Sequence, residues 1–300
     1  MLSIVIPFYK LTFFEATLQS LSFQTDKRFK VYIGDDASSE NPALILKKFQ
    51  GLFDFEYKRF DNNLGSISLV KQWERCIALT NNGEWIMILG DDDVLSKNVV
   101  HEFYNNLNEI NEFNINVVKF STVVIDELGK PISKVFKNNK ILKSTEALYD
   151  KLNHKSRSSL SEHFFRKSEY EKHKFKNYDI AWHSDDMAWL EFSNFKYIYC
   201  INSASISIRV SEKSISGSKT NTIRKNVASF HFYNDLINKH LSEFNWAQRK
   251  LVIQYYEFKT VIVKRKSLKI YIKLFWLYAR DFHFITILRF TFRFIFKHKN

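Results

Sequence analysis

The chain has 300 residues, enough for one large domain with an appendage or for two domains, and its 45% hydrophobic content is sufficient for a sizeable core. Lys and Arg number 45 against 32 Asp and Glu, and the formal net charge of +13 favours an anionic partner such as a nucleotide, nucleic acid or lipid headgroups. Two cysteines are too few for a disulfide framework, the opening residues are expected to form a strand rather than a signal peptide, and no apolar run is long enough to predict a transmembrane helix.

Strands and helices alternate along the first part of the chain. Short apolar runs predict strands at Leu2–Ile6, Val31–Ile33, Phe53–Phe60 and Trp85–Leu89. Hydrophobic residues at helical spacing follow each of the first three runs, which predicts a parallel, Rossmann-like sheet with helices on both faces. Further along, the pattern predicts a helix ending near Glu112, a strand at Val117–Val124 and a looser stretch at Lys130–Lys143.

Carboxylates follow two of these predicted strands. Asp35 and Asp36 follow the second, and the triplet Asp91–Asp93 follows the run that ends at Leu89. Adjacent carboxylates repel one another and are costly to desolvate, so they need a cation or open water, and hard oxygen ligands favour Mg²⁺ or Mn²⁺ over zinc. The alternative for the triplet alone is a solvated turn that caps the next helix. Two acidic clusters at one edge of a sheet favour a ligand site.

A further carboxylate pair, Asp185 and Asp186, lies in the aromatic segment Asp179–Phe192. Burial in such surroundings would raise a carboxyl pKa and could produce a general base. The alternative is a helix N-cap formed by Ser184 and Asp185, and the two roles can coexist. We interpret His183 as a packed or surface histidine because no metal-ligand spacing partner is near it.

From Val261 the composition becomes basic and aromatic. On a helix, Lys269, Lys273 and Arg280 fall on one side beside an aromatic face, a pattern that suits the headgroup region of an anionic membrane. The alternative is a helical appendage packed on the rest of the chain or on a dimer partner. We expect a break near Arg280, and the alternating phenylalanines of Phe290–Phe296 leave the last stretch open between helix and strand. Three later cations share a different side of a helix: Arg289, Arg293 and Lys297.

Five motifs, in this order and spacing, resemble glycosyltransferase family 2, with a GT-A fold, over roughly the first two-thirds of the chain. They are SIVIPFY, GDDAS, NNLG, GEWIMILGDDD and SDDMAWLEF. The resemblance implies a metal-dependent, hexosyltransferase-like enzyme that uses Mg²⁺ or Mn²⁺. It would move a sugar with inversion from a nucleoside diphosphate donor, with a UDP-sugar favoured, to a hydroxyl of a saccharide or a lipid-linked acceptor.

The resemblance also implies roles for individual residues. The nucleotide-sugar contacts would be Pro7, Tyr9, Asp35, Asp36, Asn63, Gly65, Lys71, Asp91 and Arg209. Asp92 and Asp93 would bind the metal, and Asp185 would be the catalytic base with Asp186 next in line. Arg209 could close a loop formed by Ser214–Gly217 over the diphosphate, or it could be a surface charge. Three positions depart from the family pattern: Gly90 replaces the first Asp of Asp-x-Asp-Asp, Ser184 replaces Glu before the base, and Lys71 with Gln72 stands for a basic and Asn pair.

The expected organisation is a GT-A catalytic domain at 1–218 and a helical, possible membrane-associating region at 219–300. The resemblance implies a bacterial enzyme of lipopolysaccharide or capsule synthesis that is cytoplasmic and peripheral on the inner face of the cell membrane, with a homodimer as a further possibility. Nucleic acid is not expected, because acidic clusters at the ligand edge would repel phosphates. The main alternative is a non-catalytic protein that binds a nucleotide sugar or another anionic ligand. A dehalogenase-type phosphatase is disfavoured by Leu95, and a dehydrogenase by the absence of a dinucleotide glycine fingerprint.

Overall fold

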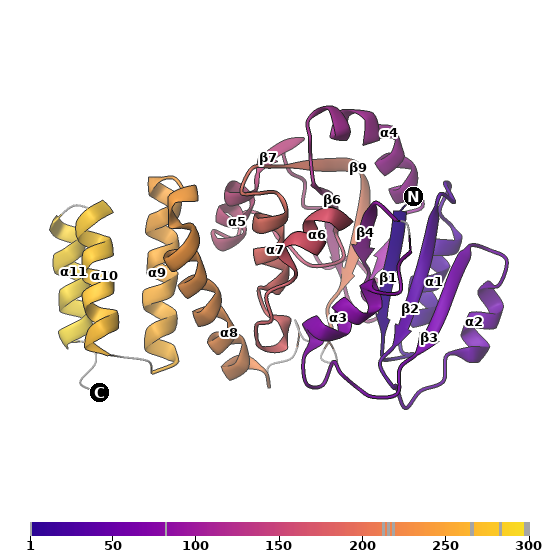
Figure 1. Cartoon of the computed structure of the whole chain (residues 1–300), viewed down its shortest axis with the longest axis horizontal. Coiled ribbons are helices and arrows are strands. Elements are labelled where there is room, and N and C mark those ends of the chain that lie inside the picture. Colours follow the sequence, from indigo (N-terminus) through magenta and orange to yellow (C-terminus); the bar gives the residue numbers. More distant parts are fainter. Residues whose placement is uncertain are drawn as a thin grey trace. The chain divides into compact units, whose positions relative to one another are not determined.

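The first part of the chain forms one half of the sheet, and its strands are parallel, as the alternation of strands and helices in the sequence predicts. The computed structural model describes residues 2–81, 83–211, 214, 217, 220–264, 267–281 and 284–296. Its parallel strands run in the order β3-β2-β1-β4 across the sheet (Figure 1). Their bounds are Leu2–Phe8 (β1), Phe29–Asp35 (β2), Asp54–Arg59 (β3) and Trp85–Ile88 (β4). The predicted α/β class and the parallel pairing of these strands are confirmed.

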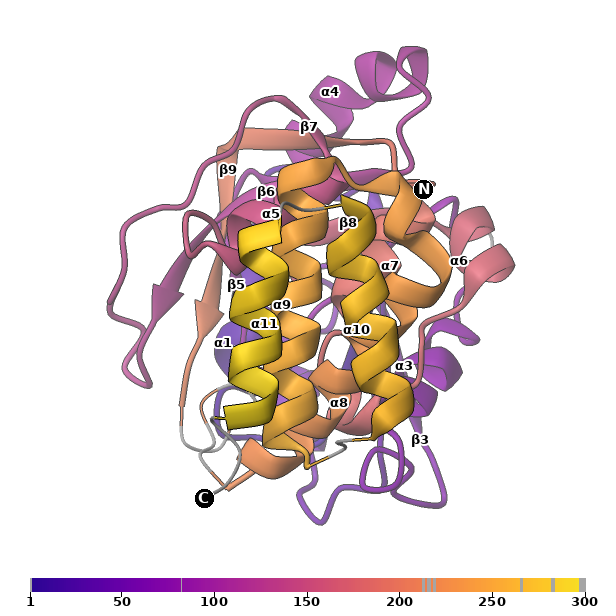
Figure 2. The same cartoon turned by 90° about the vertical axis from the view of Figure 1, so that its left-hand side faces the viewer.

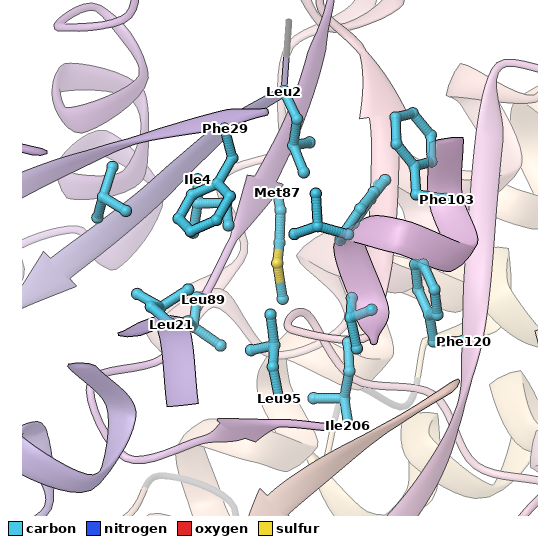
Figure 3. Close-up of a cluster of buried hydrophobic side chains, with 14 of the residues drawn as sticks. Leu2, Ile4, Leu21, Phe29, Met87, Leu89, Leu95, Phe103, Phe120 and Ile206 are labelled. Carbon is cyan, nitrogen blue, oxygen red and sulfur yellow. The ribbon is translucent and has the colours of Figure 1, made fainter. Parts of the chain in front are cut away.

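Side chains alternate along β1 and enter two cores on opposite faces of the sheet. Ile4 and Ile6 belong to the cluster that includes α1 and α2, part of which is shown in Figure 3. Val5 belongs to the other cluster, which includes α3. These helices span Phe14–Ser22 (α1), Ala43–Phe49 (α2) and Leu69–Ile77 (α3). Because helices cover both faces, a ligand reaches this part of the sheet at the strand ends.

The second half of the sheet mixes parallel and antiparallel strands, an arrangement that the sequence did not predict. In the described residues the sheet has nine strands in the order β3-β2-β1-β4-β8-β6-β9-β5, with β7 also paired to β9. β8 is antiparallel to β4 and β6, whereas β6 and β9 are parallel. The added strands span Val94–Leu95 (β5), Val117–Ile125 (β6), Ile141–Lys143 (β7), His163–Arg166 (β8) and Tyr197–Arg209 (β9). The helices between them are Val99–Glu112 (α4), Ser144–Leu152 (α5), Lys167–His173 (α6), the short turn Asp179–Ala181 and Ser184–Phe192 (α7).

The chain divides into two compact units, Met1–Lys219 and Thr220–Asn300. The second unit is helical, with bounds Thr222–Asp235 (α8), Leu236–His240 (η2), Leu241–Glu243 (η3), Trp246–Ile262 (α9), Leu268–Asp281 (α10) and Phe284–Phe296 (α11). Asn245 and Gln248 form a capping box at the start of α9. Within this unit, α10 and α11 lie side by side with α9 behind them (Figure 2).

The second unit resolves two questions about the end of the chain. The phenylalanine-rich stretch, which the sequence left open between strand and helix, is the helix α11. The break expected near Arg280 falls after α10, which ends at Asp281. Over the part of the chain that the structure describes, no helix is both long and apolar enough to cross a bilayer.

Candidate active site

A cleft of about 670 Å³ opens at the carboxyl ends of β1 and β4. Its lining comes from the end of β1 and the turn after it, the acidic triplet after β4, the loop before β8, the segment that leads into α7 and the end of β9. Most of the residues expected at the site lie in this lining: Pro7, Tyr9, Asp36, Asn63, Gly65, Asp91, Asp92, Asp93, Asp185, Asp186 and Arg209. Asp35 and Lys71 are not among the lining residues.

The three adjacent aspartates have different surroundings. Asp91 is tied to the end of β1, because its Oδ2 accepts hydrogen bonds from the backbone N–H groups of Tyr9 at 2.9 Å and Lys10 at 3.0 Å. Asp93 is buried, and its Oδ1 accepts from the backbone N–H of Arg209 at 2.9 Å. Asp92 is half-buried, and no other residue in the described ranges donates a hydrogen bond to its carboxylate. Asp92 thus has a carboxylate that is wholly available to a ligand, whereas one oxygen of Asp91 and one of Asp93 already accept backbone hydrogen bonds.

Negative charge is poorly compensated around this triplet. Burial, followed by the charges of Asp93 and Asp91, raises the pKa of Asp92 to about 8. Burial also raises the pKa of Asp93 to about 6, although a hydrogen bond from Ser161 opposes the rise, and it raises the pKa of Asp91. A cation bound here would restore the charged forms of these groups, since opposite charge favours the ionised carboxylate.

Gly90 gives the carboxylates room to converge. A Cβ placed on Gly90 would lie 2.9 Å from Asp92 Oδ1 and 3.2 Å from Asp93 Oδ2, so both oxygens border the same small space. Two hard oxygens at a site of excess negative charge fit a divalent cation such as Mg²⁺ or Mn²⁺. In the described ranges, no three His, Cys, Asp or Glu side chains form a group that could hold a metal by themselves. Water and substrate phosphate would have to complete the shell, which is usual for Mg²⁺.

The neighbouring residues Asp185 and Asp186 are separated by their environment. Lys151 Nζ lies 2.6 Å and 2.7 Å from the two carboxylate oxygens of Asp186, and His183 Nδ1 donates to the same group at 2.7 Å. Burial alone would raise the pKa of Asp186, but the charge of Lys151 and the hydrogen bond from His183 outweigh it and hold that pKa well below its usual range. For Asp185, burial and the charge of Asp186 raise the pKa to about 7. Of these two carboxyl groups, Asp185 is the one that can exchange a proton near neutral pH.

The segment that leads into α7 has an unusual backbone. Ile180, Ala181 and His183 have φ values of 49°, 55° and 69°, although none of them is glycine. Such left-handed conformations are costly for residues with a Cβ and occur often at functional sites. All three residues line the cleft, and the turn directs the start of α7 toward it. His183 is a packed residue, one of the two interpretations of the sequence, and its contact with Asp186 was not predicted.

Asp36 and Asp35 serve different parts of the structure. The carboxylate of Asp36 accepts from the backbone N–H groups of Leu64 at 2.7 Å and Gly65 at 2.9 Å, and it pairs with Arg75. A Cβ at Gly65 would lie 2.4 Å from Asp36 Oδ2, so any larger residue would displace this carboxylate from its hydrogen bonds. Asp35 is fully buried outside the cleft lining. Its partners are Tyr57 Oη at 2.5 Å, Arg59 Nη1 at 3.0 Å and the backbone N–H of Ser38 at 2.8 Å.

Arg209 is buried at the end of β9. Its Nε donates to the carbonyl of Asp92 at 3.0 Å, and its Nη1 donates to the carbonyls of Asp126 and Glu127 at 2.7 and 3.1 Å. The surface-charge interpretation of Arg209 is therefore wrong. The loop expected to follow it includes residues 215 and 216, which lie outside the described residues. Lys71 is exposed on α3, away from the cleft lining.

Three basic residues in the cleft lining were not predicted: Lys10, Lys151 and Arg157. Lys151 lies on α5, far from the acidic motifs in sequence, and no local pattern connects it with Asp186. Arg157 also lines the cleft, and its Nη1 is buried without a hydrogen-bond partner among the described residues. Its charge opposes the rise in the pKa of Asp93. Arg157 lies within the polar loop that follows α5, whose composition resembles an ordinary surface loop and gives no signal of a site.

A family model and a curated relative that match this chain are both described as glycosyltransferases. The family model described as Glycosyl transferase family 2 matches residues 3–195. An uncharacterized glycosyltransferase of Mycoplasma pneumoniae is 34% identical over 76 residues, which is 25% of this chain and 25% of that protein. The alignment thus spans only a quarter of the relative.

Solved structures share the fold at low sequence identity. S. aureus TarS 1-349 in complex with UDP-GlcNAc has a TM-score of 0.65 and 13% identity, covering 93% of this chain and 80% of that chain. The same protein in complex with UDP has a TM-score of 0.61 and 14% identity, covering 87% and 72%. GalNAc-T7 with UDP, GalNAc and Mn²⁺ has a TM-score of 0.55 and 9% identity, covering 88% and 56%. At these identities the likeness shows a common fold.

Proposed function

Since the chain belongs to glycosyl transferase family 2, we propose that it is an inverting, hexosyltransferase-like enzyme that takes a sugar from a nucleoside diphosphate donor. One observation carries the proposal: a single cleft holds Asp92, whose negative charge is poorly compensated, and Asp185, whose pKa of about 7 suits a general base. Asp92 suits a metal-bound diphosphate, and Asp185 suits the acceptor hydroxyl. The transfer needs both at one reaction centre.

Asp185 is the proposed catalytic base. As the acceptor oxygen attacks the anomeric carbon, Asp185 takes the hydroxyl proton and the bond from that carbon to the diphosphate oxygen breaks. A single displacement of this kind inverts the anomeric configuration. Asp186 stays ionised in its pair with Lys151, so we assign it a positioning role at the start of α7 instead of the proton transfer.

Donor binding is proposed at the β1 and β4 side of the cleft. Pro7, Tyr9, Asn63 and Gly65 would line the nucleotide pocket. Asp36 is the proposed contact to the nucleobase because it lies in the lining. The buried hydrogen bonds of Asp35 and the exposed position of Lys71 give no support to donor contacts from either residue. Lys10, Arg157 and Arg209 line the cleft and act on the charges of the triplet, and their positive charge suits the diphosphate. The UDP and UDP-GlcNAc complexes of TarS support a UDP-sugar as the donor.

The proposed metal is Mg²⁺ or Mn²⁺, held by Asp92 and Asp93, while Asp91 fixes the turn to β1. When bound, the ion supplies positive charge that stabilises the leaving diphosphate. The Mn²⁺ in the GalNAc-T7 structure supports this choice. We further propose a saccharide or lipid-linked acceptor in the synthesis of a bacterial surface glycan, lipopolysaccharide or capsule, at the inner face of the cell membrane.

Calorimetry tests the proposal. The full chain is titrated with UDP, GDP and dTDP, first with Mn²⁺ and then with a chelator, and we expect tight binding of one nucleotide that the chelator abolishes. Asp185→Asn should bind that nucleotide like the wild type but lose hydrolysis of the matching nucleotide sugar. If no nucleotide binds with metal present, the donor assignment is wrong. If Asp185→Asn keeps wild-type hydrolysis, the assignment of the base is wrong.

A further inference from the structure

The helical pair α10 and α11 exposes apolar side chains on one side. We call this side the outer hairpin face and define it by Leu268, Ile272 and Trp276 on α10 and Leu288 and Phe292 on α11. Residues four apart lie on the same side of a helix, so each set forms a stripe. Trp276 is 67% exposed and Phe292 is 60% exposed, which is unusual for such large apolar groups in one patch.

The opposite side of the same helices is packed within the second unit. Tyr278 is buried and donates to Glu257 Oε2 on α9 at 2.7 Å, and Arg293 on α11 pairs with the same carboxylate at 3.0 Å. Leu274 and Phe290 are also fully buried. Figure 2 shows α10 and α11 side by side in front of α9. These contacts fix which side of the pair remains exposed.

The cations of this region divide between the two sides. Lys273, which the sequence grouped with Lys269 and Arg280, donates instead to Asn238 at 2.7 Å and lies over a tyrosine ring of α9. Lys269 and Arg289 are exposed, and neither forms an ion pair with any residue that the structure describes. Lys273 and Arg293 thus have partners on the packed side, while Lys269 and Arg289 lie at the surface.

The segment that carries the hairpin has a strongly positive net charge. Residues 264–300 contain ten Lys and Arg and a single acidic residue, Asp281. If a second copy docked through the outer hairpin face, two positively charged segments would meet and repel each other. A lipid bilayer offers negative phosphates beside an apolar interior. These match the exposed cations and the exposed apolar side chains of the outer hairpin face. An amphipathic helix with Trp and Phe on one face and cations beside them is typical of proteins that lie in a membrane interface.

We propose that the outer hairpin face docks on an anionic lipid bilayer, with α10 and α11 parallel to the surface. Trp276, Phe292 and the aliphatic residues of the face enter the headgroup and acyl boundary, while Lys269 and Arg289 contact lipid phosphates. This names the surface through which the proposed enzyme meets its membrane. The docking itself uses only the second unit and requires no nucleotide, so it stands or falls separately from the proposed donor chemistry.

Vesicle flotation of the full chain tests the docking. We expect the wild type to float with vesicles of phosphatidylcholine mixed with phosphatidylglycerol, to remain unbound with phosphatidylcholine alone, and to dissociate as salt is raised. The double variant Trp276→Ser/Phe292→Ser should weaken binding at least about tenfold. The double variant Lys269→Gln/Arg289→Gln should weaken it about fivefold for each cation removed and lower the salt dependence.

Matched variants control for general surface effects. Ile223→Ser/Leu128→Ser removes two apolar side chains that are 79% and 80% exposed outside the hairpin, and Lys130→Gln/Lys196→Gln removes two exposed cations of the first unit. Both should bind vesicles like the wild type, and all variants should keep the wild-type thermal transition.

Three results would overturn the docking proposal: equal binding to neutral and anionic vesicles, wild-type binding by the hairpin variants, or a dimer in sedimentation that the same hairpin variants dissociate. Loss of nucleotide binding in calorimetry with vesicle binding intact would contradict the donor assignment alone.

Discussion

Replacing Asp92 with Asn should stabilise the metal-free protein. The pKa of Asp92 is raised from 3.8 to about 8, first by burial and then by Asp93 and Asp91. Between these two values the folded protein holds a proton that the unfolded chain has released, so the free energy of unfolding falls as pH rises from about 4 to about 8. Asn carries no such charge, and the variant should lose this part of the pH dependence.

The size of the effect follows from the shift. At pH 7 the difference in the pKa of Asp92 corresponds to about 4 kcal/mol. Asp92 is half-buried and shares its titration with Asp93, so we reduce the expected gain to about 2 kcal/mol. For a unit of this size, such a gain raises the melting temperature by roughly 4–8 °C.

Thermal unfolding followed by circular dichroism measures the effect in a chelator at pH 5 and pH 7.5, and then with Mn²⁺. The gain of Asp92→Asn over the wild type should be larger at the higher pH, and Mn²⁺ should raise the melting temperature of the wild type but not of the variant. Asp61→Asn, an exposed carboxylate outside the cleft lining, should behave like the wild type throughout. A variant that is less stable than the wild type in chelator, or one that gains as much from Mn²⁺, would refute the reasoning.

Three further predictions concern the other side of the cleft and its turn. Hydrolysis of the nucleotide sugar should rise with pH through about 7, as Asp185 loses its proton, and a flat pH profile would contradict a base of that pKa. Lys151→Met leaves the Asp186 charge without its main partner, so it should lower the free energy of unfolding by about 3–5 kcal/mol in urea titrations. It should also move the pH profile of hydrolysis to higher pH, because the Lys151 charge lowers the pKa of Asp185. Lys151→Arg should keep most of the wild-type stability and pH profile. Gly65→Ala forces a Cβ against Asp36 Oδ2 and should weaken nucleotide binding in calorimetry by at least about tenfold; wild-type affinity would show that the turn is not part of the pocket.

Local patterns in the sequence predicted the first part of the fold because that part depends on local rules. Apolar runs such as Trp85–Leu89 are long enough to fill a buried strand, and glycine with aspartate ends them. The strands that were missed depend on distant partners. β8 has only four residues, His163–Arg166, and becomes a strand because β4 and β6 lie on either side of it. A parallel half-sheet was therefore predictable, whereas its antiparallel continuation was not.

The same distinction explains the cleft. Adjacent carboxylates are visible in the sequence, and strand ends predict that they meet. Lys151 and Arg157 are invisible because their importance comes from where α5 and its following loop lie in the fold. For Arg209 the sequence suggested a surface charge as one alternative. In the structure its guanidinium is buried and donates hydrogen bonds to three backbone carbonyls, which the sequence does not reveal.

Asp185 and Asp186 show why a motif cannot assign roles by itself. Consecutive residues on a helix point about 100° apart, so the first turn of α7 directs one carboxylate to Lys151 and leaves the other half-buried in the cleft. Identical side chains next to each other thus acquire pKa values that move in opposite directions, one below its usual range and one to about 7. Burial and the charge of Asp186 raise the pKa of Asp185, while the charge of Lys151 and the hydrogen bond from His183 lower the pKa of Asp186. It follows that changes to Lys151 or His183, which supply no proton to the reaction, should alter the pH at which Asp185 works.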